Sequence, residues 1–300
     1  MLESRVLTPR GLDAEGTWAA LKRLVLEVIS GASGDRLVVC GVGCGGPMSS
    51  GSGEVSPLNI PAWREFHLRG RLMELTGFET FVDNDAKALA LAEGWLGGAR
   101  ETSNYVAIVV STGVGGGIVL NDRLLEGRLG NAGHIGHVVV VPEGRVCACG
   151  GRGCLEAEAS GTAIAAITGG EPAEASLDVI ERSGALLGRA VASVANLLDL
   201  SLAVVSGSVA LGFGDPFFMA ARRELATRAK LDFSREAKIE RAGLGAMGPI
   251  IGAAAVGWRG LFANGSESGA SSWLPAARMS SRSVDVSGPR HDSASKGIRP

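Results

Sequence analysis

Three cysteines and a histidine lie close together in the middle of the sequence. The cysteines are Cys147, Cys149 and Cys154, and His137 precedes the first of them by ten residues. Three thiolates and one imidazole form the ligand set of a closed, tetrahedral, structural zinc site. An odd count of five cysteines in a 300-residue chain argues against a disulfide framework. The pattern therefore favours zinc over the alternative, a glycine-rich surface turn that only happens to contain cysteines.

A second group of polar residues, Asp83-Asn84-Asp85, follows a short apolar run and begins an alanine-rich segment. A carboxylate at such a junction can act as a general base towards a hydroxyl group. Spacing alone favours a simpler interpretation, in which Asn84 or Asp85 caps the helix that follows.

Two glycine-containing turns also follow apolar runs. The first, 111–117, reads S-T-G-V-G-G-G; its backbone N–H groups could cradle phosphate oxygens, and Thr112 adds a hydroxyl. It lacks the G-K-[ST] ending of a P-loop, and a tight hairpin fits its spacing equally well. The second, Ser206-Gly207-Ser208, would let a nucleotide approach the backbone, although an ordinary strand–helix turn is the default interpretation.

Composition narrows the classes of function. The chain is 46% hydrophobic and 20% charged, with a net charge of −2, as in an ordinary globular protein. No general basic field is present to attract nucleic acid, and aromatic residues are too few, at 5%, for a base-stacking surface. No apolar run reaches the roughly 20 residues of a membrane span. Because no signal-peptide pattern begins the sequence, we expect a cytoplasmic protein.

Hydrophobic periodicity predicts alternating helices and strands, which indicates an α/β architecture. The predicted helices cover residues 13–31, 64–76, 85–96, 177–198, 216–230 and 246–259. The predicted strands cover residues 36–42, 79–82, 105–110, 116–120, 138–141, 202–206 and 238–241. From residue 265 to residue 300 the sequence is rich in Ser, Gly, Arg and Pro, and we expect a disordered tail.

The cysteine-rich segment, Gly127–Gly161, resembles the ROK family of sugar kinases and sugar-responsive repressors. The residues that carry this resemblance are Gly136-His137, Gly144, Cys147, Cys149-Gly150, Gly153-Cys154 and Glu156. The resemblance extends over most of the chain, from about Val39 to about Trp258. It implies an actin-like (ribonuclease H-like), two-lobed sugar kinase fold with a Cys3His zinc knuckle. The small lobe would span residues 1–103 and the large lobe residues 104–264, with the helix at 246–259 able to pack on the small lobe.

The resemblance also assigns roles in ATP-dependent phosphorylation of a hexose, as in a glucokinase. Asp85 would be the general base, with Asp83 as the rival candidate. The implied sugar-binding residues are Asn59, Asn84, His134, His137 and Glu156. Thr112, Gly113 and Gly115 would contact the phosphates of ATP, Gly207 would contact its adenosine, and Mg²⁺ would accompany the nucleotide.

Two departures from the family pattern bear on this function. His134 stands where sugar kinases of the family usually have a glutamate, so the site can still bind a polyol but the resemblance leaves its preference among hexoses open. The sequence contains no D-x-G-G-T motif, which in these kinases holds the ATP phosphates and Mg²⁺, and it starts at what resembles the following strand, residues 6–10. Either the start codon is placed too late or the element is absent. The second case favours an alternative function, a zinc-stabilised sugar-binding pseudokinase or sugar sensor without turnover.

The family's repressors carry a helix-turn-helix ahead of the kinase-like body. No such segment fits before residue 10, and no basic patch replaces it, so we do not expect DNA binding. The family resemblance suggests a homodimer.

Overall fold

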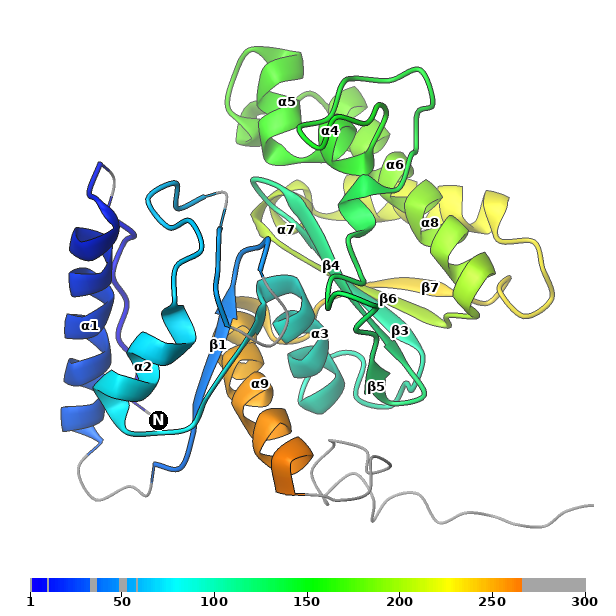
Figure 1. The fold of residues 1–300 in the computed structure, drawn as a ribbon. Helices are drawn as coiled ribbons and strands as arrows, with labels where there is room; N and C mark the ends of the chain where they lie inside the picture. Colours follow the sequence, from blue (N-terminus) through cyan, green and yellow to red (C-terminus); the bar gives the residue numbers. More distant parts are fainter. Residues whose placement is uncertain (1, 10, 33–36, 49–52, 58, 266–300) are drawn as a thin grey trace, which may run out of the picture.

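Helices and strands alternate along the chain in a computed structural model, which describes residues 2–9, 11–32, 37–48, 53–57 and 59–265 (Figure 1). The α-helices are α1 (Ala14–Gly31), α2 (Leu68–Thr76), α3 (Asp85–Trp95), α4 (Leu155–Ala159), α5 (Gly161–Thr168), α6 (Leu177–Leu198), α7 (Ser208–Phe213), α8 (Asp215–Arg228) and α9 (Gly248–Gly265). The strands are β1 (Cys40–Cys44), β2 (Thr80–Asn84), β3 (Tyr105–Val110), β4 (Val114–Leu120), β5 (Arg123–Leu124), β6 (Leu202–Ser206) and β7 (Lys238–Arg241).

The larger sheet of the described residues has the strand order β5-β4-β3-β6-β7. Strands β3, β6 and β7 run parallel, whereas β4 and β5 are antiparallel additions at one edge. Alternate residues of β3 enter different cores: Val106 and Ile108 pack towards α6 and α8, and Ala107 packs towards α3 and α9. Both faces of the sheet are therefore covered, as expected of parallel strands joined by helices.

The smaller sheet pairs β1 with β2 in parallel, with Cys44 opposite Asn84. Helix α1 covers this part of the molecule, and its Trp18 packs into a cluster with Trp63 and Phe66. The last helix, α9, returns to the same region and packs against β1, β2 and α3. Its approach is so close that a Cβ atom on Gly41 would lie 1.9 Å from the carbonyl oxygen of Ala253.

Helix α3 lies between the two sheets and contacts β1, β2, β3 and β4 (Figure 1). Residues Ala86 to Gly94 are all buried, which explains the run of alanines, because only small side chains allow neighbours to approach from every side. The N-terminus of this central helix carries Asp85. In the described part of the chain, no helix has the length and apolar content that crossing a membrane requires.

The predicted strand at 138–141 is wrong. The four valines favour a strand by propensity. Their backbone groups, however, form hydrogen bonds with Gly153 and Leu155, which follow in the same cysteine-rich segment. Gly153 accepts from the N–H groups of Val140 and Val141, and Val138 accepts from Leu155. The segment keeps only an isolated bridge between Val139 and Cys154.

Other boundaries also differ from the predictions. Residues 6–9 form no strand, and Leu7 is 90% exposed because the segment does not join either sheet. The helix predicted from residue 64 begins at Leu68, since Glu65 has a positive φ and Phe66 bridges to Val55. Residues 266–300, which contain nearly all of the predicted disordered tail, lie outside the described residues, as does residue 10.

Candidate functional site

Asp85 is the first residue of α3 and its carboxylate reaches solvent. Its Oδ1 accepts a hydrogen bond from the N–H group of Ala86, at 2.8 Å. The surrounding protein desolvates the carboxyl and raises its pKa, which backbone hydrogen bonds only partly oppose. No ion pair involves Asp85 in the part of the chain that the structure describes. An accessible, unpaired carboxylate with a raised pKa is suited to proton abstraction.

Asp83, the rival base, has different surroundings. Its Oδ1 lies 3.0 Å from Lys87 Nζ and accepts from the N–H group of Asn84, and its Oδ2 lies 3.4 Å from Arg259. Two cations thus hold this carboxylate, so Asp85 is the better candidate.

Asn84 and Asn59 lie on the two sides of one glycine turn. Asn84 Oδ1 caps α3 by accepting from the N–H groups of Ala86 and Lys87. Its Nδ2 would lie 3.4 Å from a Cβ atom on Gly46, and Asn59 Oδ1 would lie 3.3 Å from one on Gly45. Glycine at these two positions leaves room for both amides to face a ligand. Sequence spacing suggested the helix cap for Asn84, and the structure shows that the cap occupies only its oxygen.

His134 and Glu156 lie near the start of β4. Glu156 accepts a hydrogen bond from the N–H group of Val114, at 2.9 Å. The His134 and His137 rings stack with their centroids 5.9 Å apart. Desolvation, followed by the influence of His137, lowers the pKa of His134, although the charge of Glu156 opposes this.

Glycines in β4 bring these residues close to α3. A Cβ atom on Gly115 would lie 3.1 Å from that of Ala86, and one on Gly116 would lie 3.0 Å from the carbonyl oxygen of Gly133. The predicted turn is therefore shorter than expected: Gly115 is inside β4, which begins at Val114. Packing against α3 accounts for glycine at this position, and its predicted phosphate contact stays a prediction.

The predicted metal ligands come together. One ligand atom from each of His137, Cys147, Cys149 and Cys154 lies within 4.8 Å of all the others. His137 Nδ1 is 3.7 Å from Cys147 Sγ, and Cys149 Sγ is 3.8 Å from Cys154 Sγ. Zinc–sulfur bonds of about 2.3 Å in a tetrahedron put the sulfurs roughly 3.8 Å apart, so the donor set and its spacing fit zinc.

The two remaining turns lie side by side where β3 and β6 end. Ser111 Oγ is 2.9 Å from Ser208 Oγ, and the carbonyl oxygen of Thr112 accepts from both the N–H and the hydroxyl of Thr162. Gly207 has a φ of +102°, and a Cβ atom there would lie 2.2 Å from the carbonyl oxygen of Val110. The carboxyl ends of parallel strands are a common place for nucleotides. The structure thus groups Thr112, Gly113 and Gly207 around one such edge.

Some supporting residues were not predicted. Arg64 donates to the carbonyl oxygens of Pro57, Ile60 and Trp63 and so braces the turn that contains Asn59. Glu158, which is 2% exposed, accepts from the N–H group of Arg145 and pairs with Arg182. It thereby ties the cysteine-rich segment to α6. Two glutamates alternate with apolar residues in α4, which reads L-E-A-E-A, and this local pattern does not distinguish Glu158 from Glu156.

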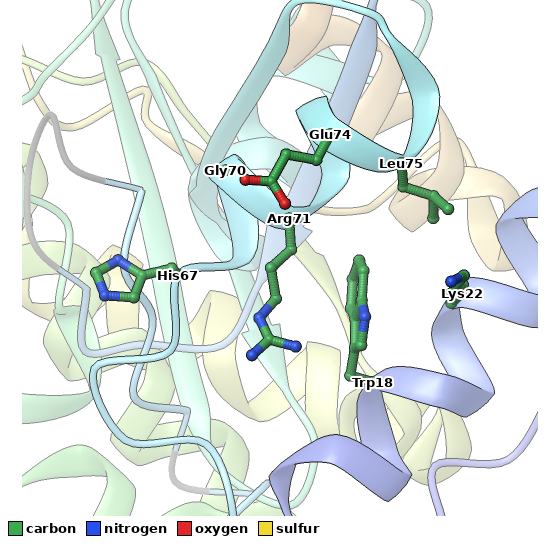
Figure 2. Close-up of a pocket in the computed structure, with 7 residues that line it drawn as sticks. All are labelled: Trp18, Lys22, His67, Gly70, Arg71, Glu74 and Leu75. Carbon is green, nitrogen blue, oxygen red and sulfur yellow. The ribbon is translucent and has the colours of Figure 1, made fainter.

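Figure 2 shows a separate pocket of about 710 Å³ between α1 and α2, which contains none of the predicted site residues. The Arg71 guanidinium lies over the rings of Trp18 and Phe66 and pairs with Glu15. Arg71, one of the cations that line this pocket, is therefore already paired with a carboxylate. A second pocket, of about 840 Å³, includes Asn59 in its lining.

A model of the ROK family matches residues 3–258 of the sequence. The chain belongs to the ROK family. Among curated relatives in this family, the Thermotoga maritima glucokinase is 40% identical over 155 residues, which are 51% of this chain and 49% of that protein. The match thus spans about half the length of this glucokinase. An N-acetylmannosamine kinase of Haemophilus influenzae is 37% identical over 226 residues, 70% of this chain and 74% of that one.

Solved structures of ROK proteins share the fold. The ROK hexokinase of Thermus thermophilus has a TM-score of 0.74 and 32% identity, covering 86% of this chain and 90% of that one. The ROK glucokinase of Streptomyces griseus, in complex with glucose and AMPPNP, has a TM-score of 0.71 and 27% identity. The match covers 84% of this chain and 90% of that one. A ROK transcriptional regulator, a homologue of the Escherichia coli MLC protein, has a TM-score of 0.70 and 28% identity, covering 82% and 69%. The family resemblance and the actin-like α/β fold inferred from sequence are confirmed.

Proposed function

We propose that the protein phosphorylates a hexose with ATP, as a glucokinase does. The observation that carries the proposal is the contrast at the start of α3. Among the described residues Asp85 has no ion-pair partner and its pKa is raised, whereas two cations hold Asp83. The Streptomyces griseus relative, crystallised with glucose and AMPPNP, supports both substrates.

In this mechanism Asp85 accepts the proton of the attacking sugar hydroxyl. Asn84 Nδ2 and the Asn59 amide bind ring hydroxyls from the two sides of the Gly45-Gly46 turn. His134, His137 and Glu156 bind the sugar from the β4 side, with His137 using Nε2 because Nδ1 faces the cysteines. These contacts fix the hydroxyl next to Asp85, and positioning provides much of the rate of phosphoryl transfer.

ATP would bind where β3 and β6 end. The N–H groups around Thr112 and Gly113 would donate to phosphate oxygens, and Gly207 would let adenosine lie against the backbone. Mg²⁺ bound to the phosphates would neutralise the charge that develops during transfer.

We further propose that His137, Cys147, Cys149 and Cys154 hold one structural zinc ion. The zinc would keep the segment that carries His134 and His137 folded against Glu156. Three further expectations belong to the proposal: lobes that divide near residue 103, a homodimer and a cytoplasmic location. The mass measured by light scattering tests the dimer.

N-acetylmannosamine is a second candidate substrate. His134 stands where a carboxylate is usual in this family's sugar kinases, and an imidazole N–H can donate to the carbonyl oxygen of an acetamido group, which a carboxylate cannot do. The relatives that align with more than two thirds of their length include N-acetylmannosamine kinases.

The test is ADP release from ATP and Mg²⁺ with a panel of glucose, mannose, fructose, N-acetylglucosamine and N-acetylmannosamine, with sugar binding measured by calorimetry in parallel. Sugar-dependent ADP release supports the kinase, and the best sugar identifies the substrate. Binding without release, by a protein with its zinc in place, would instead support the alternative function, a sugar sensor without turnover.

A further inference from the structure

Four charged side chains form a closed ring of alternating sign beside the candidate site. Lys87 pairs with Asp83 at 3.0 Å and with Glu126, and Arg259 pairs with the same two carboxylates. Lys87 Nζ also donates to the carbonyl oxygen of Gly130, at 3.1 Å. Two cations and two anions balance each other, and together they compensate for burying Lys87, whose side chain is only 3% exposed.

The ring joins parts of the chain that are far apart in sequence. Asp83 lies in β2, Lys87 lies in the first turn of α3, Arg259 belongs to α9, and Glu126 follows β5. Burial alone would raise the pKa of Glu126, but the charges of Arg259 and Lys87 outweigh this and hold its pKa below the usual value. The carboxylate is therefore charged at neutral pH, and the ring keeps its balance.

The ring also connects the two sides of the sugar site. Lys87 is two residues from Asp85 on the same helical turn. Glu126 and Gly130, which Lys87 holds, begin the segment that leads to His134, and the carbonyl oxygen of Glu126 accepts from the N–H group of Ala132. These contacts therefore link the start of α3 to the segment that leads to His134.

We propose that Lys87 is a positioning residue which, through Glu126 and Gly130, fixes the segment 126–134 against the start of α3 and so sets the geometry of the sugar site. This inference rests on the proposed hexose kinase activity. Lys87 acts through other residues and does not touch the substrate. The ATP side is braced separately, by the contacts of Ser111 and Thr112 with Ser208 and Thr162. Loss of the ring should therefore raise the KM for the sugar and leave the KM for ATP unchanged.

The test compares three variants: Lys87→Met, Glu126→Gln and the control Arg222→Met. Arg222 is matched to Lys87 because it also donates to a carboxylate, Glu240, and to a backbone carbonyl, that of Ile239, but away from the site. We expect Lys87→Met and Glu126→Gln to raise the KM for hexose by about tenfold or more and to leave the KM for ATP unchanged. Arg222→Met should change neither constant.

Glu126→Gln keeps both cations paired with Asp83, so it carries the test even when Lys87→Met does not fold. A folded Glu126→Gln variant with an unaltered KM for hexose would overturn the proposal, as would an equal rise in the KM for ATP. Hydrogen exchange gives a readout independent of turnover. Amides of 126–134 and of the first turn of α3 should exchange faster in Glu126→Gln, with α6 unaffected. If the unmodified chain phosphorylates no hexose, the hydrogen-exchange comparison alone tests the proposal. Unchanged exchange of these amides in Glu126→Gln would then contradict it.

Discussion

Asp83 and Asp85 are two residues apart, but their surroundings give them different chemistry. Lys87 and Arg259 hold the first carboxylate, whereas protein atoms desolvate the second without supplying a cation. Asp85 gains accessibility and a raised pKa, which are the properties of a base. Asp83 lies in β2 and Asp85 begins α3, so the two carboxylates have different neighbours.

The pH dependence of turnover should report this difference. An ordinary aspartate has a pKa of about 3.9. Because desolvation raises the pKa of Asp85, its carboxylate becomes protonated at a higher pH than that of an ordinary aspartate. We expect kcat/KM for hexose to fall on the acidic side through one ionisation with an apparent pKa clearly above that value. A rate profile that stays flat down to pH 4, in protein that remains folded, would show that Asp85 is not the base.

The backbone at position 207 requires a glycine. Its φ of +102° and its contact with Val110 leave no space for a side chain. We expect Gly207→Ala to lower the free energy of unfolding by roughly 1–3 kcal/mol. Chemical denaturation measures this change, with Gly212→Ala as the control.

Gly212 lies in α7, and a Cβ atom there would have no neighbour within 4 Å. Gly212→Ala should be neutral or stabilising by up to about 1 kcal/mol. Equal effects of the two substitutions would mean that the turn at Gly207 is not tightly packed against β3.

Among the structural elements, the cysteine-rich segment has little regular secondary structure to hold its conformation. We therefore expect its folding to depend on the candidate metal ligands. It contains the short 3-10 helix η1 (Ile135–His137), isolated bridges and the start of α4. Glu158 and Arg182 attach it to α6, and the cluster of His137 with three cysteines closes it. Metal binding to such a segment contributes directly to folding.

We therefore expect about one zinc per chain by elemental analysis and its loss in Cys149→Ser, together with a lower thermal midpoint. Cys40→Ser is the control, since Cys40 lies in β1 and outside the cluster. It should retain the zinc. Zinc-free protein with an unchanged midpoint would show that the segment is only a turn.

Local pattern was enough to predict most elements and the clustering of His137 with the three cysteines. The three cysteines occupy eight residues, so a single turn brings them together whatever the rest of the fold does. The alanine-rich helix α3 and the apolar strands β3 and β6 are similarly local signals. The valine run at 138–141 gave a wrong strand prediction. Strand propensity is a local property, whereas the hydrogen bonds of this run depend on Gly153 and Leu155.

Long-range partners could not be predicted in this way. Arg259 is 133 residues from Glu126 and 176 residues from Asp83. Only the return of α9 to β1 and α3 brings them together. The family resemblance implied that this helix could pack on the small lobe, but no local pattern specifies which side chains then meet. The turn at Gly45-Gly46 is a similar case, because its position between Asn59 and Asn84 depends on how β1 pairs with β2.

At the scale of the whole molecule, α3 is the element on which both parts of the candidate site depend. Its N-terminus carries Asp85, and its buried faces contact strands of both sheets (Figure 1). Buried Glu93, further along α3, accepts from the N–H groups of Gly98, Gly243 and Leu244, and so attaches the segment before α9 to the same helix. In the proposed function, the sugar binds at one end of α3 and ATP binds at the neighbouring edge of the larger sheet.

The measurement that tests this account most directly compares the unmodified protein with Asp85→Asn, using hexose-dependent ADP formation and calorimetric sugar affinity on the same samples. We expect the substitution to reduce kcat by at least about a hundredfold, because a general base typically contributes that much, while the sugar affinity changes little. Asp83→Asn serves as the comparison, and it should retain more turnover than Asp85→Asn. Full activity in Asp85→Asn would contradict the account.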